Sequence, residues 1–397
     1  MINKGKEAYL AKCAFALALT LGLSISANTL ALSMKDIEIH GFFTAGATIS
    51  NVEKNYLRTT NEDISFDEDS ALGLQIFIPI DDKITLQAQI LANSSKQAEP
   101  DFEAEVDWAF VSYQLSDTLL IRGGRIRYPL LMHGDYAEVG YSYPWIRPPQ
   151  VVYGNIPITA VDGVDLVATI PMGDVELTVQ PFVASRDDSI LIQDLNRELD
   201  ADLNNMVGLK LALQSEHIRL HATVLNYEWS LDKDQPAMWV VENVMGLGAI
   251  KDAEVNTYAL GVNVDWNSFV FMSEYVHIDY EREKGQFALP GTEGWYAMAG
   301  YQMGKWLPHV TYGQRDAKST LGVINDNLTL GLRYDLTPSA ALKFEWSNIN
   351  PEPAFGPFSG DTQGPVEPTP YGAFEFPAYK NPNEGAQVYS IAIDVIF

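Results

Sequence analysis

A group of charged side chains of both signs, mixed with aromatic residues and prolines, lies between residues 119 and 150. Arginines crowd the segment LLIRGGRIRYP, and acidic and aromatic residues follow shortly after it. Arginines and carboxylates that face each other across a narrow aqueous passage create a transverse field, which acts on every ion that passes. We therefore predict a charged constriction. The residues assigned to it are Arg122, Arg125, Arg127, Asp135, Tyr136, Glu138 and Arg147.

Catalytic chemistry is not indicated by the sequence. It contains no GxSxG, HExxH, phosphate-binding or dinucleotide-binding motif. His133 precedes Asp135 closely, but a histidine beside an aspartate in a loop is usually a simple polar contact. The acidic stretch 200–205 lacks the glycine and the late glutamate of a calcium-binding loop. We predict no enzyme activity, no metal site and no cofactor.

The elements that position the charged group are expected to be β-strands. Apolar residues alternate with polar ones through 37–49, 72–78, 84–90 and 328–334, as in strands with one buried and one polar face. We count roughly sixteen such segments of about ten residues, the length that a tilted strand needs to cross a bilayer. No helical pattern of comparable length occurs.

The connections between these segments differ in length. Short turns, as at 81–83 and 336–339, alternate with long polar connections such as 128–157 and 349–385. Short turns on one side and long loops on the other are typical of a transmembrane antiparallel β-barrel. A secreted β-sandwich or propeller would not require this asymmetry.

The chain ends in a strand pattern, VYSIAIDVIF, that stops at Phe397. A barrel in lipid leaves no unpaired edge, so we expect this strand to pair with the strand at 37–49. A C-terminal phenylalanine preceded by alternating apolar residues resembles the assembly signal of Gram-negative outer-membrane proteins.

An export segment precedes the strands. Basic residues are followed by the apolar run 14–23, which is too short to span a bilayer. We expect cleavage after Ala31 or Ala27, so that residues 1–31 are a signal peptide and residues 32–397 form one barrel domain. The only cysteine, Cys13, lies in this segment, and the mature chain therefore has no disulfide.

The segment 128–157 has the length and the prolines to fold into a barrel as a rigid third long loop. Its position is similar to that of the constriction loop of general porins. GRIRYP (124–129) resembles the Gly-Arg/Lys-x-x-x-Pro element of phosphate-selective porin O/P-like proteins, and residues 294–313 resemble a late hairpin of such porins. The resemblance implies a Gram-negative outer-membrane porin.

The orientation of the arginines leaves two interpretations open. Arg122 and Arg125 differ in parity, but a β-bulge at Gly123-Gly124 would turn all three arginines inward. A lipid-facing arginine costs about 2–4 kcal/mol at mid-bilayer, which favours the lumen. The arginines then either line the passage or pin the loop to the wall. Four more charged residues are expected on the lumen wall: Lys210, Glu274, Lys343 and Glu345.

From these patterns and the resemblance we expect a passive, water-filled channel for ions and small hydrophilic solutes in the outer membrane. An adhesive or structural barrel and an outer-membrane barrel hydrolase are the alternatives. Expected partners are outer-membrane lipid, lipopolysaccharide and two further copies in a homotrimer, and no nucleic acid. The formal charge of −26 resides largely in the loops, so the sign of the preferred ion stays open.

Overall fold

A computed structural model describes residues 37–52, 60–94, 102–154, 156, 158–192, 197–231, 251–281, 291–317, 324–352, 368–369, 372–373 and 385–397. The expected signal peptide, residues 1–31, lies outside the described residues. Residues Glu38–Phe397 form one compact unit. No helix in the described part of the chain is long and apolar enough to cross a membrane.

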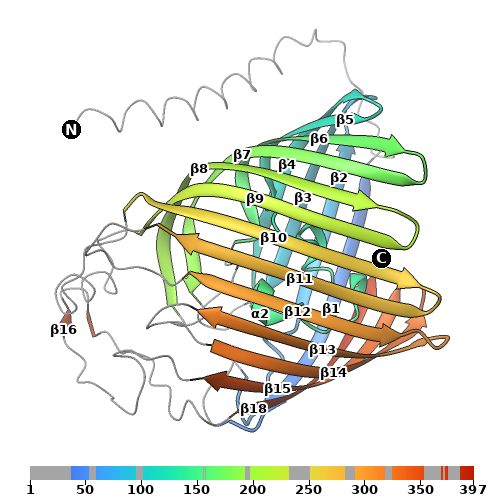
Figure 1. Cartoon of the computed structure of the whole chain (residues 1–397), viewed down its shortest axis with the longest axis vertical. Helices are drawn as coiled ribbons and strands as arrows, with labels where there is room; N and C mark the ends of the chain where they lie inside the picture. The colour runs from blue at the N-terminus through green and yellow to red at the C-terminus, as the bar shows by residue number, and fades with distance from the viewer. Residues whose placement is uncertain are drawn as a thin grey trace. The chain divides into compact units, whose positions relative to one another are not determined.

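Sixteen antiparallel strands close into a barrel, which confirms the predicted fold class (Figure 1). Each strand pairs with its neighbours along the chain, and the barrel closes where β1 pairs with β18. The strands are β1 (Glu38–Ser50), β2 (Ala71–Pro79), β3 (Ile84–Asn93), β4 (Glu103–Ser116), β5 (Leu119–Arg127), β6 (Ala160–Met172), β7 (Val175–Ile192), β8 (Arg197–Gln214), β9 (Ile218–Leu231), β10 (Ala253–Trp266), β11 (Phe269–Tyr280), β12 (Thr292–Tyr301), β13 (Trp306–Ala317), β14 (Ile324–Thr337), β15 (Ala340–Glu352) and β18 (Ala386–Ile396). Two short strands, β16 (Pro368–Thr369) and β17 (Gly372–Ala373), pair only with each other.

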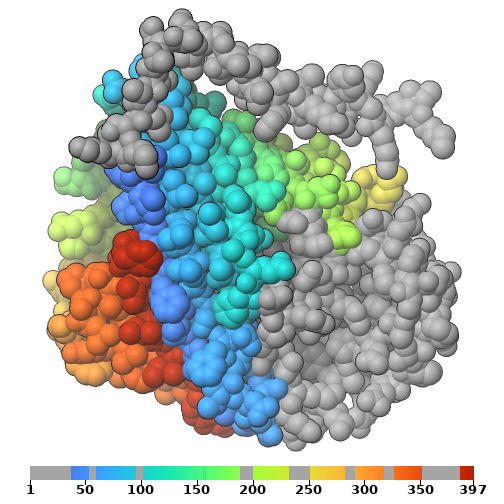
Figure 2. Space-filling view, turned by 180° about the vertical axis from the view of Figure 1, so that it is seen from behind, coloured from blue at the N-terminus to red at the C-terminus, as the bar shows by residue number. Residues whose placement is uncertain are grey.

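The closing seam joins the two ends of the barrel sequence. Thr44 lies opposite Asp394 in the β1–β18 ladder, and the red β18 runs beside the blue β1 in Figure 2. Beyond the ladder, Phe397 and Gly41 exchange two backbone hydrogen bonds of 2.7 and 2.9 Å. The Phe397 ring covers Gly41 so closely that a Cβ there would collide with it. The last residue therefore completes the pairing of the first strand.

The strand faces divide as the alternation predicts. The outer face presents aliphatic and aromatic side chains, while polar residues such as Thr44, Gln89 and Asp165 are buried on the inner face. The interior also contains apolar residues, because an inward loop packs against the wall between β8 and β12. The hydrophobic core of this barrel thus lies inside it.

Candidate pore constriction

The loop after β5 enters the barrel, as predicted. Its described residues, 128–154, 156 and 158–159, include three short turns: η2 (Gly134–Tyr136), η3 (Gly140–Ser142) and α2 (Gln150–Tyr153). Trp145 Nε1 donates a hydrogen bond of 2.7 Å to Thr311 Oγ1 on β13. On β9, Thr223 Oγ1 donates to the carbonyl oxygen of Pro129 at 3.4 Å. The loop therefore spans the lumen and is held at several walls.

Lys343 on β15 is the most completely buried cation among the described residues. Its Nζ donates to the carbonyl oxygens of Gly140 and Trp145, both at 2.6 Å. The same atom lies 2.8 Å from Asp394 Oδ2 on β18. A buried cation needs a paired charge and full hydrogen bonding, and Lys343 obtains both by fastening the loop to the seam.

Two buried carboxylates on the wall accept loop backbone N–H groups. Glu345 Oε1 accepts from Ile146 at 2.8 Å, and Glu274 Oε1 on β11 accepts from Met132 at 2.7 Å. Charge-assisted hydrogen bonds of this kind are stronger than neutral ones. Both glutamates thus hold the loop rather than facing open water.

Arg147 connects the loop to the other side of the seam. Its Nε lies 3.2 Å from Asp69 Oδ1, and its Nη2 donates to Ser390 Oγ at 2.7 Å. Because its guanidinium is engaged on both sides, Arg147 acts as a clamp between the loop and the β1–β18 wall.

Glycines on the wall make room for the loop. A Cβ at Gly313 would lie 2.6 Å from a Val151 methyl carbon, and one at Gly261 would lie 2.6 Å from Met132 Cε. A larger residue at Gly313 would collide with Val151 and with the Trp295 carbonyl oxygen, and one at Gly261 would force the Met132 side chain to move. The interior surface is therefore shaped to the loop it holds.

Asp135 differs from these groups because its side chain remains 49% exposed inside the barrel. Its Oδ2 lies 3.2 Å from Lys210 Nζ on β8. Burial by itself raises the pKa of Asp135, but the charges of Lys210 and Arg122 outweigh it, so the pKa is lowered. Asp135 is thus an ionised carboxylate that is open to the lumen.

Arg122 faces the lumen from β5. Its guanidinium forms a bidentate pair with Asp165 on β6, with Nε donating to Oδ1 at 2.9 Å, and it lies over the Phe110 ring. Gln180 on β7 donates to the other oxygen of Asp165 at 2.7 Å. Arg122 is therefore rigidly placed, and its charge reaches Asp135.

Arg125 does not join Arg122, and the prediction that a bulge turns all three arginines inward is wrong for this residue. The β5–β6 ladder runs without a register shift from Leu119 to Arg127, so Arg122 and Arg125 lie on opposite faces. Arg125 Nε donates to Asp162 Oδ1 at 3.0 Å, and the two side chains are 36% and 46% exposed. The ion pair belongs to the outer face.

Arg127 is buried at the end of β5, where the chain turns into the loop. Its Nη1 lies 3.1 Å from Asp107 Oδ2. Asp107 occupies the position at which the β3–β4 ladder shifts, and it also accepts hydrogen bonds from Gln89 and Thr159. This arrangement pins the entrance of the loop.

Several residues that the sequence interpretation did not single out complete the arrangement. Arg333 on β14 donates to the carbonyl oxygens of Tyr141 and Tyr143, at 2.6 and 3.0 Å. Arg219 on β9 lies against Tyr136: burial raises the pKa of Tyr136 and the charge of Arg219 opposes that rise. Both arginines occupy the polar face of an alternating strand, which was the available signal.

Glu138 borders an open space between the loop and the wall of β1–β3. Asn93 Nδ2 donates to Glu138 Oε2 at 3.3 Å. The cavity has a volume of about 220 Å³ and is also lined by Glu68, Tyr128 and Tyr153. Acidic side chains therefore border this space beside apolar residues of the loop such as Leu130 and Ile146.

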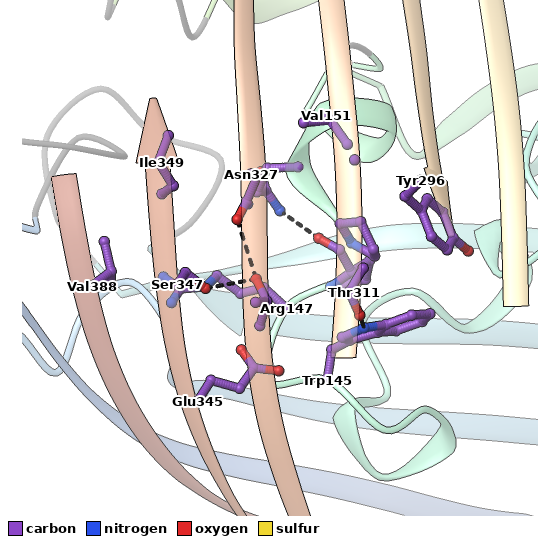
Figure 3. A pocket seen from close by; sticks show the side chains of 15 residues that line it. Trp145, Arg147, Val151, Tyr296, Thr311, Asn327, Glu345, Ser347, Ile349 and Val388 are labelled. Atoms are coloured by element: carbon purple, nitrogen blue, oxygen red, sulfur yellow. Dashed lines mark hydrogen bonds between the residues drawn. The ribbon is translucent and has the colours of Figure 1, made fainter. Parts of the chain in front are cut away.

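A smaller cavity of about 40 Å³ lies on the opposite side of the loop (Figure 3). Trp145 and Arg147 border it from the loop, and Glu345 and Ser347 border it from β15. Its size admits a few water molecules at most. The space on this side of the loop is small, and the wider space borders Glu138 on the β1–β3 side.

Residues 13–350 match the family model described as Gram-negative porin. Among curated proteins, no sequence match is found. The fold is similar to that of Salmonella typhi OmpF in complex with daunomycin (TM-score 0.56, 13% identity, covering 91% of this chain and 97% of that chain). It is also similar to an anion-selective porin from Comamonas acidovorans (0.55, 12%, 91% and 99%). A third similar structure is the trimer form of Vibrio cholerae OmpT (0.53, 11%, 91% and 99%).

The family match covers most of the chain, and these solved structures are similar to it in fold. Family and fold indicate a channel rather than an enzyme. The chain belongs to the Gram-negative porin family and forms an outer-membrane channel for small solutes.

Proposed function

We propose that ions and small hydrophilic solutes cross the barrel between the inward loop and the wall, past Asp135. The position of Asp135 carries this proposal: its ionised side chain is half open inside the barrel and faces Lys210. Charges on both sides of a narrow passage act strongly on a passing ion, since little water screens them.

The charged residues divide into two roles in this proposal. Arg122, Asp135, Tyr136 and Glu138 line the passage, with Lys210 between the loop and the wall. A second set holds the loop through buried bonds and does not meet the solute: Arg127, Arg147, Glu274, Lys343 and Glu345. Lining and pinning, which the sequence left as alternatives, are thus assigned to different residues.

Planar-bilayer recording of the refolded protein tests the channel. We expect stepwise, ohmic conductance and swelling of liposomes in isotonic solutions of small sugars. Protein unfolded by heating before addition is the control. Folded protein that neither conducts nor admits sugars would overturn the assignment of an open passage.

We further propose that the chain assembles as a homotrimer in contact with lipopolysaccharide, after removal of residues 1–31. The trimeric form of the structurally similar Vibrio cholerae protein supports the assembly. The acidic loops would meet anionic lipopolysaccharide through bridging divalent cations. No observation favours an adhesive or hydrolytic barrel.

A further inference from the structure

Three glutamines on the inner wall of the barrel hold their amide groups in the same orientation. Gln75 on β2, Gln87 on β3 and Gln114 on β4 lie on the strand face that points into the barrel, and each is half-buried. Each donates a hydrogen bond to the wall through its amide nitrogen, Nε2. These three residues are called here the amide row. The row lies beside the inward loop, because Gln75 and Val139 border one cavity of about 420 Å³.

The partners of Gln87 and Gln114 fix this orientation. Gln114 Nε2 donates to the backbone carbonyl oxygen of Ser116, which can only accept. Gln87 Nε2 lies 3.0 Å from Ser112 Oγ, and that hydroxyl donates its own proton to the carbonyl oxygen of Thr85. Because a serine hydroxyl has a single proton, Ser112 must accept from Gln87. A reversed amide would place oxygen against oxygen at both positions.

A longer chain of hydrogen bonds fixes the orientation of Gln75. Its Nε2 donates to Gln89 Oε1 at 2.7 Å, and Gln89 Nε2 donates in turn to Asp107 Oδ2 at 2.8 Å. Asp107 is paired with Arg127 at 3.1 Å, so its carboxylate is the acceptor. The chain of donors therefore runs in one direction, from Gln75 into the wall.

The outward atoms of the amide row are therefore three side-chain carbonyl oxygens. The described residues supply no donor to these oxygens. Strands β1–β4 contain no lysine or arginine, and Arg122 on the neighbouring β5 is turned to Asp165. Glu138 adds a negative charge on the same side, where Asn93 of β3 donates to it. A solute that passes here meets hydrogen-bond acceptors and negative charge.

We propose that the amide row binds the ammonium or guanidinium groups of organic cations, and that the channel therefore favours solutes with N–H donors. This inference rests on the passage proposed above and names its solute class. An ammonium group has three donors and no acceptor, so each of its protons can meet a carbonyl oxygen of the row. A carboxylate has acceptors alone and finds no partner there. A sugar hydroxyl both donates and accepts, and the row satisfies only its proton.

Four isomeric cations test the proposal with the unchanged protein. Butylammonium, diethylammonium, N,N-dimethylethylammonium and tetramethylammonium have the same mass and charge, and they carry three, two, one and no N–H donors. Reversal potentials in planar bilayers give the permeability of each cation, which is divided by its mobility in free solution. We expect permeability to rise with the number of donors, by about two- to tenfold across the series, as for one net hydrogen bond. Equal permeabilities would overturn the inference.

A double variant tests the residues of the row. Gln87→Met/Gln114→Met preserves side-chain length and removes two of the outward oxygens, so it should bring the permeabilities of butylammonium and tetramethylammonium together. Gln214→Met on β8 is the matched control, because Gln214 lies on the inner face outside the row. It should keep the wild-type order of permeabilities.

The inference fails if the double variant keeps the wild-type order or if the control loses it. The isomer series needs no variant, so it decides the inference even if the double variant does not assemble. Wild-type protein that does not conduct contradicts the channel itself, whereas conducting protein without the donor dependence contradicts the amide row alone.

Discussion

At the scale of single residues, two arginines three positions apart have different surroundings. Arg122 points into the lumen and Arg125 to the outer face. Two unit charges 4 Å apart interact by about 4 kcal/mol at an effective dielectric near 20. Arg122→Ala should therefore shift selectivity toward cations severalfold, most clearly at low salt, and Arg125→Ala should leave it unchanged. Reversal potentials in a salt gradient measure the difference.

Asp135→Asn should shift the reversal potential in the opposite direction, toward anions. Its amide keeps the shape of the side chain and removes the charge that faces Lys210. If Asp135→Asn and Arg122→Ala both leave the reversal potential fixed, the passage does not run between these groups.

His133 provides a pH dependence. Burial, with a contribution from the charge of Arg219, lowers the pKa of His133 to about 4. An unfolded histidine has a pKa near 6.5, so between about 6.5 and 4 the unfolded state binds more protons than the folded one. The contribution of neutral His133 to the free energy of unfolding is therefore fully present above about pH 6.5 and is lost as the pH falls toward 4. His133→Gln should flatten this part of a stability curve measured by urea unfolding from pH 7 to 4.

Lys343 tests the fastening of the loop. Lys343→Met leaves the buried Asp394 carboxylate without its cation and two carbonyl groups without this donor, and a broken buried ion pair costs about 3–5 kcal/mol. We expect larger and noisier conductance together with a lower denaturation midpoint. The double variant Lys343→Met/Asp394→Asn should recover part of the stability, because it buries no lone charge. If the single variant conducts quietly at the wild-type level, Lys343 does not hold the loop.

At the scale of elements, the alternation of polar and apolar residues correctly predicted the barrel strands. The bulge predicted at Gly123-Gly124 is absent from the β5–β6 ladder. Gly124 has φ +132°, and a Cβ there would lie 2.6 Å from the carbonyl oxygen of Ala109. The glycine therefore serves a close approach of two backbones. The nearest register shifts lie elsewhere, in the β3–β4 ladder beside Asp107 and in the β4–β5 ladder between Gln114 and Ser116. Glycine in a strand is compatible both with a β-bulge and with the close approach of a neighbouring backbone. The sequence alone does not distinguish these two structures.

The seam between β1 and β18 depends on the pair Gly41–Phe397. Gly41→Leu would drive a side chain into the Phe397 ring, and deletion of Phe397 removes two backbone hydrogen bonds as well as the proposed assembly signal. Both changes should lower the amount of folded barrel in the outer membrane. Heat-dependent gel mobility of membrane extracts measures it, with Phe43→Leu on the same face as the control. Unchanged assembly without Phe397 would rule out its role as a signal.

The sequence predicted that a loop enters the barrel, but not which wall residues hold it there. Length, prolines and position predicted that residues 128–157 fold inward, but Lys343 and Gly140 are 203 positions apart. No local pattern connects such positions, because the curvature and register of all the intervening strands decide which residues meet. Wall residues that were expected to meet water, such as Glu274 and Glu345, hold the loop for that reason.

At the scale of the whole molecule, a closed ladder with no free edge should survive mild detergent. We expect an unheated sample to migrate at three times the monomer mass on a semi-native gel, and to collapse to the monomer on heating. The cause is the combination of a closed barrel with the contacts of the proposed homotrimer. A single monomer band after gentle extraction would count against the trimer, whereas the barrel would still show a heat-dependent shift.

The position of the seam also affects the order in which contacts form during folding. Barrel strands pair with neighbours along the chain at every junction except the seam, where Thr44 and Asp394 are 350 positions apart. Contacts between distant positions form late, since closing a long loop is entropically unfavourable. Lys343, Ser390 and Asp394, which anchor the loop, all lie in the last two strands of the barrel. We therefore expect the last loop anchors to form in the same step that closes the barrel wall.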